Sequence, residues 1–202
     1  CRRGYLAYEL PCSCENSHLY AVFKEFMHGL GGKLYVPEDE DGIDLALLKE
    51  LKESGRERIS VYADRRRSAT FVGSGRVWEV PGQLAVPSAT QNELGSDDAN
   101  ALLRGGVLAI AEGANMPCTP DAVETFQEAD VLFAPGKAAN AGGVAVSALE
   151  MAQNAARERW SFEESEIRLR GIMADIHTAA FEAAELYGHP GDYVVGANAA
   201  GF

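Results

Sequence analysis

The sequence predicts an α/β fold: a partial doubly wound, Rossmann-like parallel sheet that is followed by C-terminal helices. Three short apolar runs, at residues 84–88, 107–111 and 131–134, alternate with single helical segments. This alternation is typical of parallel strands that are joined by right-handed crossovers. Because each run is continuously apolar, we expect the sheet to be buried on both faces.

The two helices between these strands carry start and stop signals. Ser96, which two aspartates follow, predicts the N-cap of a helix over residues 96–104, and two glycines end that helix. Thr119 predicts the N-cap of a helix over residues 119–128, with a proline at its first position. Each helix therefore connects two consecutive strands, as a parallel sheet requires.

The chain becomes helical after the third strand. Small residues at 136–143 predict an open loop that leads into a helix near Gly143, which extends over residues 144–159. Ser161, with a glutamate three residues later, predicts a capping box at the start of a second helix over residues 162–187.

The residues before the first strand are less regular. Within residues 1–32, only residues 19–30 have the apolar spacing of an amphipathic helix. Residues 33–36 predict a strand, and residues 45–51 predict a helix with its leucines facing inward. Residues 58–63 fit either an extended or a helical segment.

The segment at residues 69–80 predicts a β-hairpin. Two β-rich runs flank Gly73 and Gly75, which begin like a dinucleotide-binding fingerprint. That fingerprint needs a third glycine and a following helix, but Trp78 and Pro81 stand there instead. We therefore expect a turn that contacts no phosphate.

The composition excludes several classes of function. The chain has 202 residues, of which 47% are apolar, and its formal net charge is −12. This acidic balance argues against nucleic-acid binding, and the basic cluster at residues 65–67 is interpreted as a solvated helix end. Since no apolar run is long enough to span a bilayer and no signal peptide opens the chain, we expect no membrane partner.

The cysteines point to a reducing compartment. Their spacing to the histidines does not match a metal site, and four cysteines in this length do not form a disulfide scaffold. We therefore expect no metal and a cytoplasmic location. The four are Cys1, Cys12, Cys14 and Cys118.

Small and amide residues follow all three predicted strands, at 89–92, 113–115 and 136–140. The carboxyl ends of parallel strands share one edge of a sheet, where ligands of such folds bind. Thr, Gln and Asn offer uncharged donors and acceptors for ribose hydroxyls and a carboxamide. The same residue types also cap helices and turns, and on the residues alone the two interpretations weigh about evenly.

Four segments are similar to the glutamate dehydrogenase family, in its NADP-specific type, and the resemblance extends over residues 35–202. They are Ala-Thr-Gln-Asn-Glu-Leu at 89–94, Ala-Glu-Gly-Ala-Asn-Met-Pro at 111–117, the segment at 133–154 with its Gly-Lys-Ala-Ala-Asn-Ala-Gly-Gly-Val core, and Tyr-Val-Val-Gly-Ala-Asn at 193–198. The resemblance implies a homo-oligomeric enzyme that uses NADP or NAD to deaminate L-glutamate oxidatively to 2-oxoglutarate and ammonia.

The resemblance also implies roles for individual residues. The residues that it assigns to the cofactor are Ala89, Thr90, Gln91, Asn115 and Asn140, of which Asn140 also reaches the substrate. Val144 and Ser147 are assigned to the side-chain carboxylate of the substrate. A serine hydroxyl beside free N–H groups at a helix start suits a carboxylate. No residue of this chain is assigned to catalysis.

On this basis the chain divides into three parts. Residues 1–33 are a divergent segment, residues 34–143 a partial dinucleotide-binding domain and residues 144–202 a C-terminal helical segment.

The sequence also departs from the family pattern. The family's glycine-rich phosphate turn is not found in residues 1–32, and its catalytic lysine and aspartate belong to a preceding domain. Asp130 stands where a glycine usually precedes the third strand, and Gly82 is also unusual. We therefore interpret the chain as an internal fragment that has no turnover by itself.

Two further hypotheses stay open: a catalytically inactive remnant of the family, and a small acidic binding module. Lys137 is expected to extend to solvent or to pair with the cofactor or a backbone carbonyl rather than to act in catalysis. His177 and His189 are expected to be ordinary surface or core histidines rather than catalytic bases.

Overall fold

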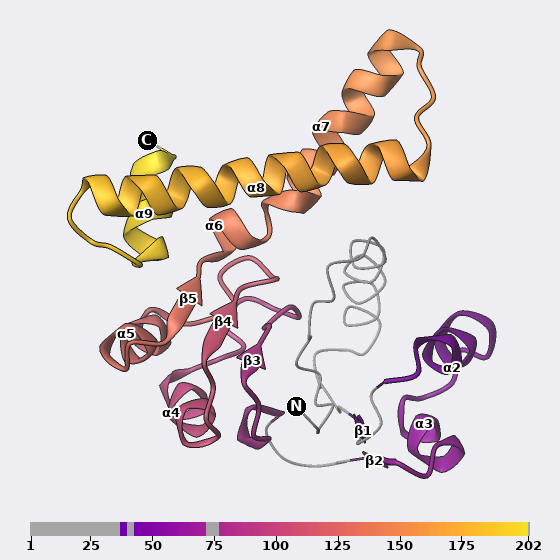
Figure 1. The fold of residues 1–202 in the computed structure, drawn as a ribbon. Coiled ribbons are helices and arrows are strands. Elements are labelled where there is room, and N and C mark those ends of the chain that lie inside the picture. The colour runs from indigo at the N-terminus through magenta and orange to yellow at the C-terminus, as the bar shows by residue number, and fades with distance from the viewer. Residues whose placement is uncertain (1–36, 40–42, 72–76, 202) are drawn as a thin grey trace.

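The computed structural model describes residues 37–39, 43–71 and 77–201, and Figure 1 shows their arrangement. Three of the expected elements lie outside the described residues: the helix at 19–30, the strand at 33–36 and the turn at Gly73–Gly75.

The central sheet has three parallel strands in the order β3-β4-β5. They are β3 (Leu84–Ala85), β4 (Ala109–Ala111) and β5 (Leu132–Ala134), and they are shorter than the apolar runs that predicted them. Between them lie α4 (Ser96–Arg104) and α5 (Pro120–Glu128). The predicted alternation of parallel strands and single helices is confirmed.

The core lies between this sheet and the pair α4–α5. Ile110 and Phe133 of the sheet belong to one buried cluster with Phe126 of α5, and the rings of Phe126 and Phe133 stack with their centroids 6.0 Å apart. The opposite face differs from the expectation. Leu132, which alternates with Phe133 along β5, is 51% exposed, so the sheet is not buried there on both faces.

The two helix starts differ in how well the sequence predicted them. At α5 the hydroxyl of Thr119 accepts a hydrogen bond from the Ala122 N–H (3.3 Å), as predicted. At α4 the predicted cap is wrong by one residue: Gly95 is the N-cap, and the Asp98 carboxylate accepts the Gly95 N–H (3.2 Å). The acidic first turn thus supplies the cap that a glycine cannot.

Four helices follow the sheet: α6 (Gly136–Ala139), α7 (Ala141–Ala156), α8 (Phe162–Leu186) and α9 (Tyr193–Ala200). α7 and α8 form a hairpin that projects away from the sheet, and α9 packs against α8 beside β5 (Figure 1). The capping box of α8 is confirmed. The expected open loop at 136–143 is wrong, because α6 occupies its first half.

A second, smaller group of elements precedes the sheet. β1 (Pro37–Asp39) pairs antiparallel with β2 (Ala69–Phe71), beside α2 (Leu45–Lys49), the π-helical turn η1 (Glu50–Ser54) and α3 (Ser60–Arg65). Its buried residues are Leu51, Ile59 and Tyr62. The undecided segment at 58–63 therefore contributes to a helix.

The predicted hairpin at 69–80 is wrong in its pairing. β2 pairs with β1, and the residues expected to form the second arm contain the 3-10 helix η2 (Val77–Glu79). A β-rich composition did not decide between a local and a distant partner strand.

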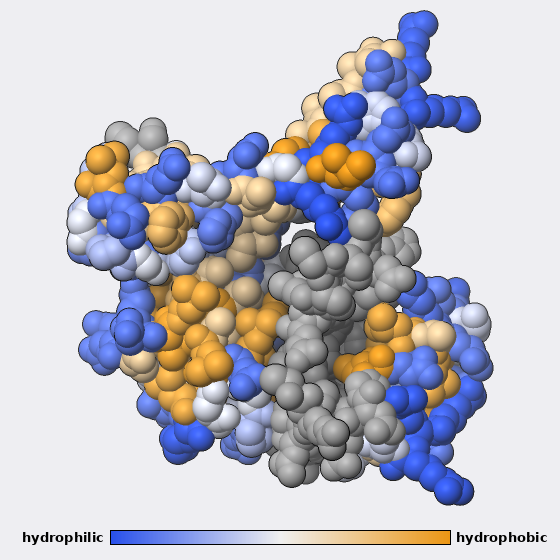
Figure 2. Space-filling model, viewed as in Figure 1, coloured by the Kyte–Doolittle hydropathy of each residue, from blue (hydrophilic) through white to orange (hydrophobic). Residues whose placement is uncertain are grey.

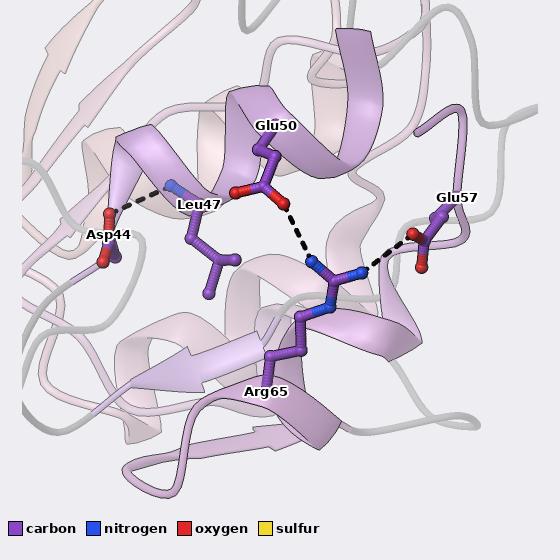
Figure 3. A network of polar contacts seen from close by, with 5 residues as sticks. All are labelled: Asp44, Leu47, Glu50, Glu57 and Arg65. Carbon is purple, nitrogen blue, oxygen red and sulfur yellow. Dashed lines mark hydrogen bonds and ion pairs between the residues drawn. The ribbon is translucent and has the colours of Figure 1, made fainter. Parts of the chain in front are cut away.

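The basic cluster at residues 65–67 lies at the end of α3, as expected. Arg65 donates to the carboxylates of Glu50 and Glu57, both at 3.0 Å, and Figure 3 shows this arrangement. Arg66 lies 3.6 Å from the Asp44 carboxylate. Acidic neighbours thus neutralise the cluster, which agrees with a solvated helix end.

Candidate functional site

The loops that follow β3, β4 and β5 meet at the carboxyl edge of the sheet. The first two are joined directly, because the N–H groups of Gly113 and Ala114 donate to the carbonyl of Pro87 at 2.9 and 3.1 Å. These backbone bonds hold the predicted first and second ligand loops side by side.

The second and third loops are joined by a buried carboxylate. Glu112, directly after β4, is 6% exposed. Its Oε2 accepts the N–H of Gly136 at 2.7 Å, and its Oε1 accepts the N–H of Cys118 at 3.2 Å. One side chain therefore holds the start of α6 against the loop that carries Asn115.

Two of the predicted cofactor residues contact each other at this edge. Nδ2 of Asn140 donates to Oδ1 of Asn115 (2.8 Å) and to the carbonyl of Ala114 (2.9 Å). Both hydrogens of the Asn140 amide are thereby used. Among the described residues, Oδ1 of Asn140 and Nδ2 of Asn115 have no hydrogen-bond partner, so one acceptor and one donor group there can serve a ligand.

The remaining predicted cofactor residues lie in the first loop. The N–H of Ala89 donates to Oε1 of Glu93 at 2.8 Å, while Thr90 and Gln91 are exposed. Burial raises the pKa of Glu93, although hydrogen bonds from the Ala89 and Thr90 backbone oppose the shift. No hydrogen bond among the described residues joins Thr90 or Gln91 to Asn115 or Asn140.

The predicted substrate residues lie at the start of α7. Val144 and Ser147 are three residues apart on this helix, and Val144 is 75% exposed. The hydroxyl of Ser147 donates to the carbonyl of Gly143 at 3.2 Å, one turn earlier. Binding of a carboxylate by this hydroxyl therefore requires it to rotate away from its own helix.

One of the expectations for Lys137 was that it pairs with a backbone carbonyl, and the structure shows a different partner. Its ammonium group pairs with the side-chain carbonyl of Asn198, and this contact connects α6 to α9. His177 lies 2.9 Å from the Tyr193 hydroxyl, and the His189 N–H donates to the Ala184 carbonyl at the end of α8. The His177 contact joins α8 to α9, and the His189 bond is a backbone bond at the end of α8.

Cys118 lies beneath the same edge. Burial, together with the nearby Glu112 carboxylate, raises the pKa of its thiol, which disfavours the reactive thiolate. Within the described ranges no group of three or more His, Cys, Asp or Glu side chains could hold a metal ion. None of the helices described there is long and apolar enough to cross a bilayer.

The sequence model of the Glutamate/Leucine/Phenylalanine/Valine dehydrogenase family matches residues 30–202. The chain belongs to this family. It is 52% identical over 167 residues to the NADP-specific glutamate dehydrogenase of Escherichia coli, a match that covers 81% of this chain and 37% of that protein. The corresponding Helicobacter pylori protein is 48% identical over 171 residues, with 81% and 38% covered.

Solved structures of the family agree with the fold. The crystal structure of Plasmodium falciparum glutamate dehydrogenase matches with a TM-score of 0.78 and 38% identity, over 83% of this chain and 37% of that one. The α/β, Rossmann-like fold class is thereby confirmed, as is the resemblance on which the family assignment was predicted. The chain spans less than two fifths of the length of these relatives.

Two acidic residues of this edge were missed by the sequence analysis. Glu112 and Glu93 both anchor backbone N–H groups of the ligand loops. The signal for Glu112 was available: an acidic residue stands between a buried strand and a turn of small residues, whose backbone N–H groups can compensate its burial. Glu93 has no comparable signal, since it follows an exposed turn.

Proposed function

We propose that the complete protein is an NADP-dependent glutamate dehydrogenase, and that this chain supplies part of its dinucleotide-binding domain and the helix that receives the substrate. The observation that carries the proposal is the amide pair Asn115–Asn140. It brings two carboxamides from two strand ends to one rim of a parallel sheet, where ligands of such folds bind. Relatives about half identical to the chain carry the name NADP-specific glutamate dehydrogenase.

The three loops would divide the dinucleotide among them. The small first loop, with Ala89, Thr90 and Gln91, allows close approach of the cofactor to the backbone. The free donor on Asn115 suits a ribose hydroxyl, and the free acceptor on Asn140 suits the amide of a nicotinamide. When bound, the nicotinamide supplies the hydride acceptor for oxidation of an amino acid.

The start of α7 would bind the side-chain carboxylate of glutamate. Of its first N–H groups, that of Gly143 donates to the carbonyl of the N-cap residue Asn140 at 3.3 Å. A helix start leaves its earlier N–H groups without intrahelical partners and carries the positive end of the helix dipole. The exposed Val144 is the fourth residue of α7 and Ser147 is the seventh, so both lie within its first two turns. A carboxylate there would gain a hydroxyl donor as well as backbone donors.

The complete enzyme is expected to be a cytoplasmic homo-oligomer that binds small molecules. The resemblance supports assembly into a homo-oligomer, and the cysteine content supports a cytoplasmic location. L-Glutamate, 2-oxoglutarate and ammonia are the expected small-molecule partners. Neither a nucleic acid nor a membrane is expected.

The test compares two substitutions in the complete enzyme that carries this segment. Ser147→Ala should weaken glutamate binding about ten- to a hundredfold, because a hydrogen bond to a charged group is worth roughly 1.5–3 kcal/mol. Asn115→Ala should act mainly on NADP. Each ligand is titrated against each variant, so that the two effects separate.

Ser165→Ala is the matched control for the substrate arm. The Ser165 hydroxyl donates to the carbonyl of Ser161 one turn earlier (3.1 Å), as Ser147 does to Gly143, but it lies on α8. This variant should keep the glutamate affinity of the wild type. Unchanged glutamate affinity in Ser147→Ala would contradict the substrate role, and a wild-type enzyme without glutamate-dependent reduction of NADP would contradict the function itself.

A further inference from the structure

Two carboxylates of the described chain are buried to the same extent, and they differ in how their charge is compensated. Glu112 and Glu166 are each 6% exposed. Glu166 lies one helical turn before Arg170, with 4.0 Å between its Oε2 and the Arg170 Nε. Glu112 has no ion pair among the described residues, and its two oxygens accept backbone N–H groups instead. A buried charge without a cation requires such donors, because it has lost its hydration.

The two donors to Glu112 come from the places where the ligand loops are anchored. Cys118 ends the loop that begins at Glu112 itself, so this bond closes the loop around Asn115. Gly136 begins α6, at whose end Asn140 stands. The carboxylate thus joins the base of one loop to the base of the other.

The site around Gly136 is tightly packed. A side-chain Cβ at this position would lie 3.0 Å from the carbonyl oxygen of Ala114, and 3.3 Å from both Nδ2 of Asn140 and Oε2 of Glu112. The distance between the two loops is therefore set by direct contact between backbone, amide and carboxylate. A shift of α6 would separate Asn140 from Asn115.

We propose that Glu112 is a positioning residue for the dehydrogenase reaction: it sets the distance between the Asn115 and Asn140 loops and so the place of the nicotinamide end of the cofactor. This inference rests on the proposed function, because only a ligand that contacts both amides is sensitive to their spacing. Glu112 itself touches neither cofactor nor substrate in this assignment. It acts through the N–H groups of Cys118 and Gly136.

Glu112→Gln tests the proposal, since it keeps the shape but turns one acceptor oxygen into an amide that faces an N–H donor. In the complete enzyme, kcat/KM for NADP should fall about ten- to a hundredfold, while the KM for glutamate changes by less than about threefold. Glu166→Gln is the matched control, because it neutralises an equally buried carboxylate on α8. Its kcat/KM for NADP should stay within about twofold of the wild type.

Thermal midpoints of both variants distinguish positioning from stability. A purely structural role predicts that the two variants lose kinetic efficiency in proportion to lost stability, and that outcome would overturn the proposal. Unchanged kcat/KM for NADP in Glu112→Gln would also overturn it. The wild-type enzyme is assayed in parallel, so absence of NADP-dependent turnover there marks a failure of the proposed function and not of the role of Glu112.

If Glu112→Gln does not fold, Gly136→Ala decides the question. This substitution keeps the carboxylate and pushes the start of α6, where the third loop begins, away from the carbonyl of Ala114 in the second loop. The same selective loss of kcat/KM for NADP is expected. A folded Gly136→Ala enzyme with wild-type kinetics for NADP would show that the spacing of the loops does not matter, and the proposal would be rejected.

Discussion

The carboxyl edge of the sheet and the α7–α8 hairpin carry the two halves of the proposed site, and they are built in different ways. The edge rests on a core of buried side chains and is joined by buried hydrogen bonds. α7 has no buried residue, and Val144 and Met151 on it are exposed. Figure 2 shows apolar surface over the region of the sheet and a mostly hydrophilic surface on the projecting end of the hairpin.

This difference indicates that the geometry of the sheet edge is specified within the chain to a greater extent than the geometry of the α7–α8 hairpin. Buried hydrogen bonds within the described chain fix the positions of Asn115 and Asn140. Few such contacts constrain the exposed face of α7 around Ser147. Substitutions at the edge should therefore affect folding and cofactor geometry together. Substitutions on α7 should leave the folding of this chain almost unchanged.

The largest expected effect is at Phe126, which is fully buried and stacks on Phe133 beneath the edge. Phe126→Ala should lower the free energy of unfolding by about 3–5 kcal/mol, because it removes a large buried side chain and leaves a cavity. Met151→Ala on α7 should change it by less than about 0.5 kcal/mol. Urea unfolding of the 202-residue chain, followed by circular dichroism, measures both.

The comparison fails if the two substitutions have similar effects. A loss above about 2 kcal/mol for Met151→Ala would show that α7 packs against more of the chain than its exposure indicates. A small loss for Phe126→Ala would show that the core beneath the edge collapses readily around the vacated space.

The sequence predicted best where local chemistry decides the structure. The parallel strands followed from apolar runs between single helices, and Thr119 and Ser161 marked their helix starts because caps depend only on neighbouring N–H groups. The first turn of α4 shows the limit of this logic. Asp98 supplied the cap there, although Ser96 had the preferred residue type.

The predictions failed where a distant partner decides. β2 pairs with β1, whose residues stand thirty or more positions earlier in the chain, so the local hairpin pattern at 69–80 was misleading. α6 forms in a stretch expected to be open, with its first N–H bound by Glu112 twenty-four residues earlier. The pairing of Asn140 with Asn115 likewise depends on the register of β4 and β5, which no local pattern encodes.

A smaller effect is expected at the ends of α5 and α7, where the same backbone motif occurs in both regions. Asp130 and Arg157 adopt positive φ angles of 55° and 56°, and each is followed by the 6→1 hydrogen bond of a Schellman motif. Asp130→Gly and Arg157→Gly should each stabilise the chain by about 0.5–1 kcal/mol, because glycine adopts this conformation without strain. Thermal and urea unfolding measure the gain.

Gly106 provides the reverse control, since it holds the same position after α4 with φ at 84° and has open space around its Cα. Gly106→Ala should destabilise by about 1 kcal/mol through backbone strain alone. Backbone strain does not depend on the packing of side chains, so a gain is expected both at the edge and in the hairpin, and it should be the smaller at Asp130 because Asp adopts positive φ more readily than Arg. A gain at only one of the two sites would show that local packing, and not φ, determines the cost.

The smallest effect concerns pH, and the two regions should respond with opposite signs. Burial raises the pKa of Glu93 at the edge above its ordinary value of 4.5, whereas hydrogen bonds from Ser161 lower the pKa of the exposed Glu164 at the start of α8. A carboxyl with a raised folded pKa binds its proton more tightly when folded, so its contribution to stability falls as pH rises from about 4.5 through that pKa. A carboxyl with a lowered folded pKa contributes stability above 4.5 and loses it as pH falls through the folded value.

Glu93→Gln keeps an oxygen for the Ala89 N–H and removes the charge, so the variant should be at least as stable as the wild type at pH 7 and should lack that decline. Glu164→Gln keeps the capping geometry, because glutamine also fits a capping box, and it should lose the stability that the wild type gains above 4.5. Urea midpoints at intervals between about pH 4 and 7 compare the three chains, and the difference between each variant and the wild type isolates one carboxyl. Differences of the same sign for both variants would contradict the assignment of burial to Glu93 and of hydrogen bonding to Glu164 as the dominant causes, and with it the contrast between a buried edge and an exposed hairpin.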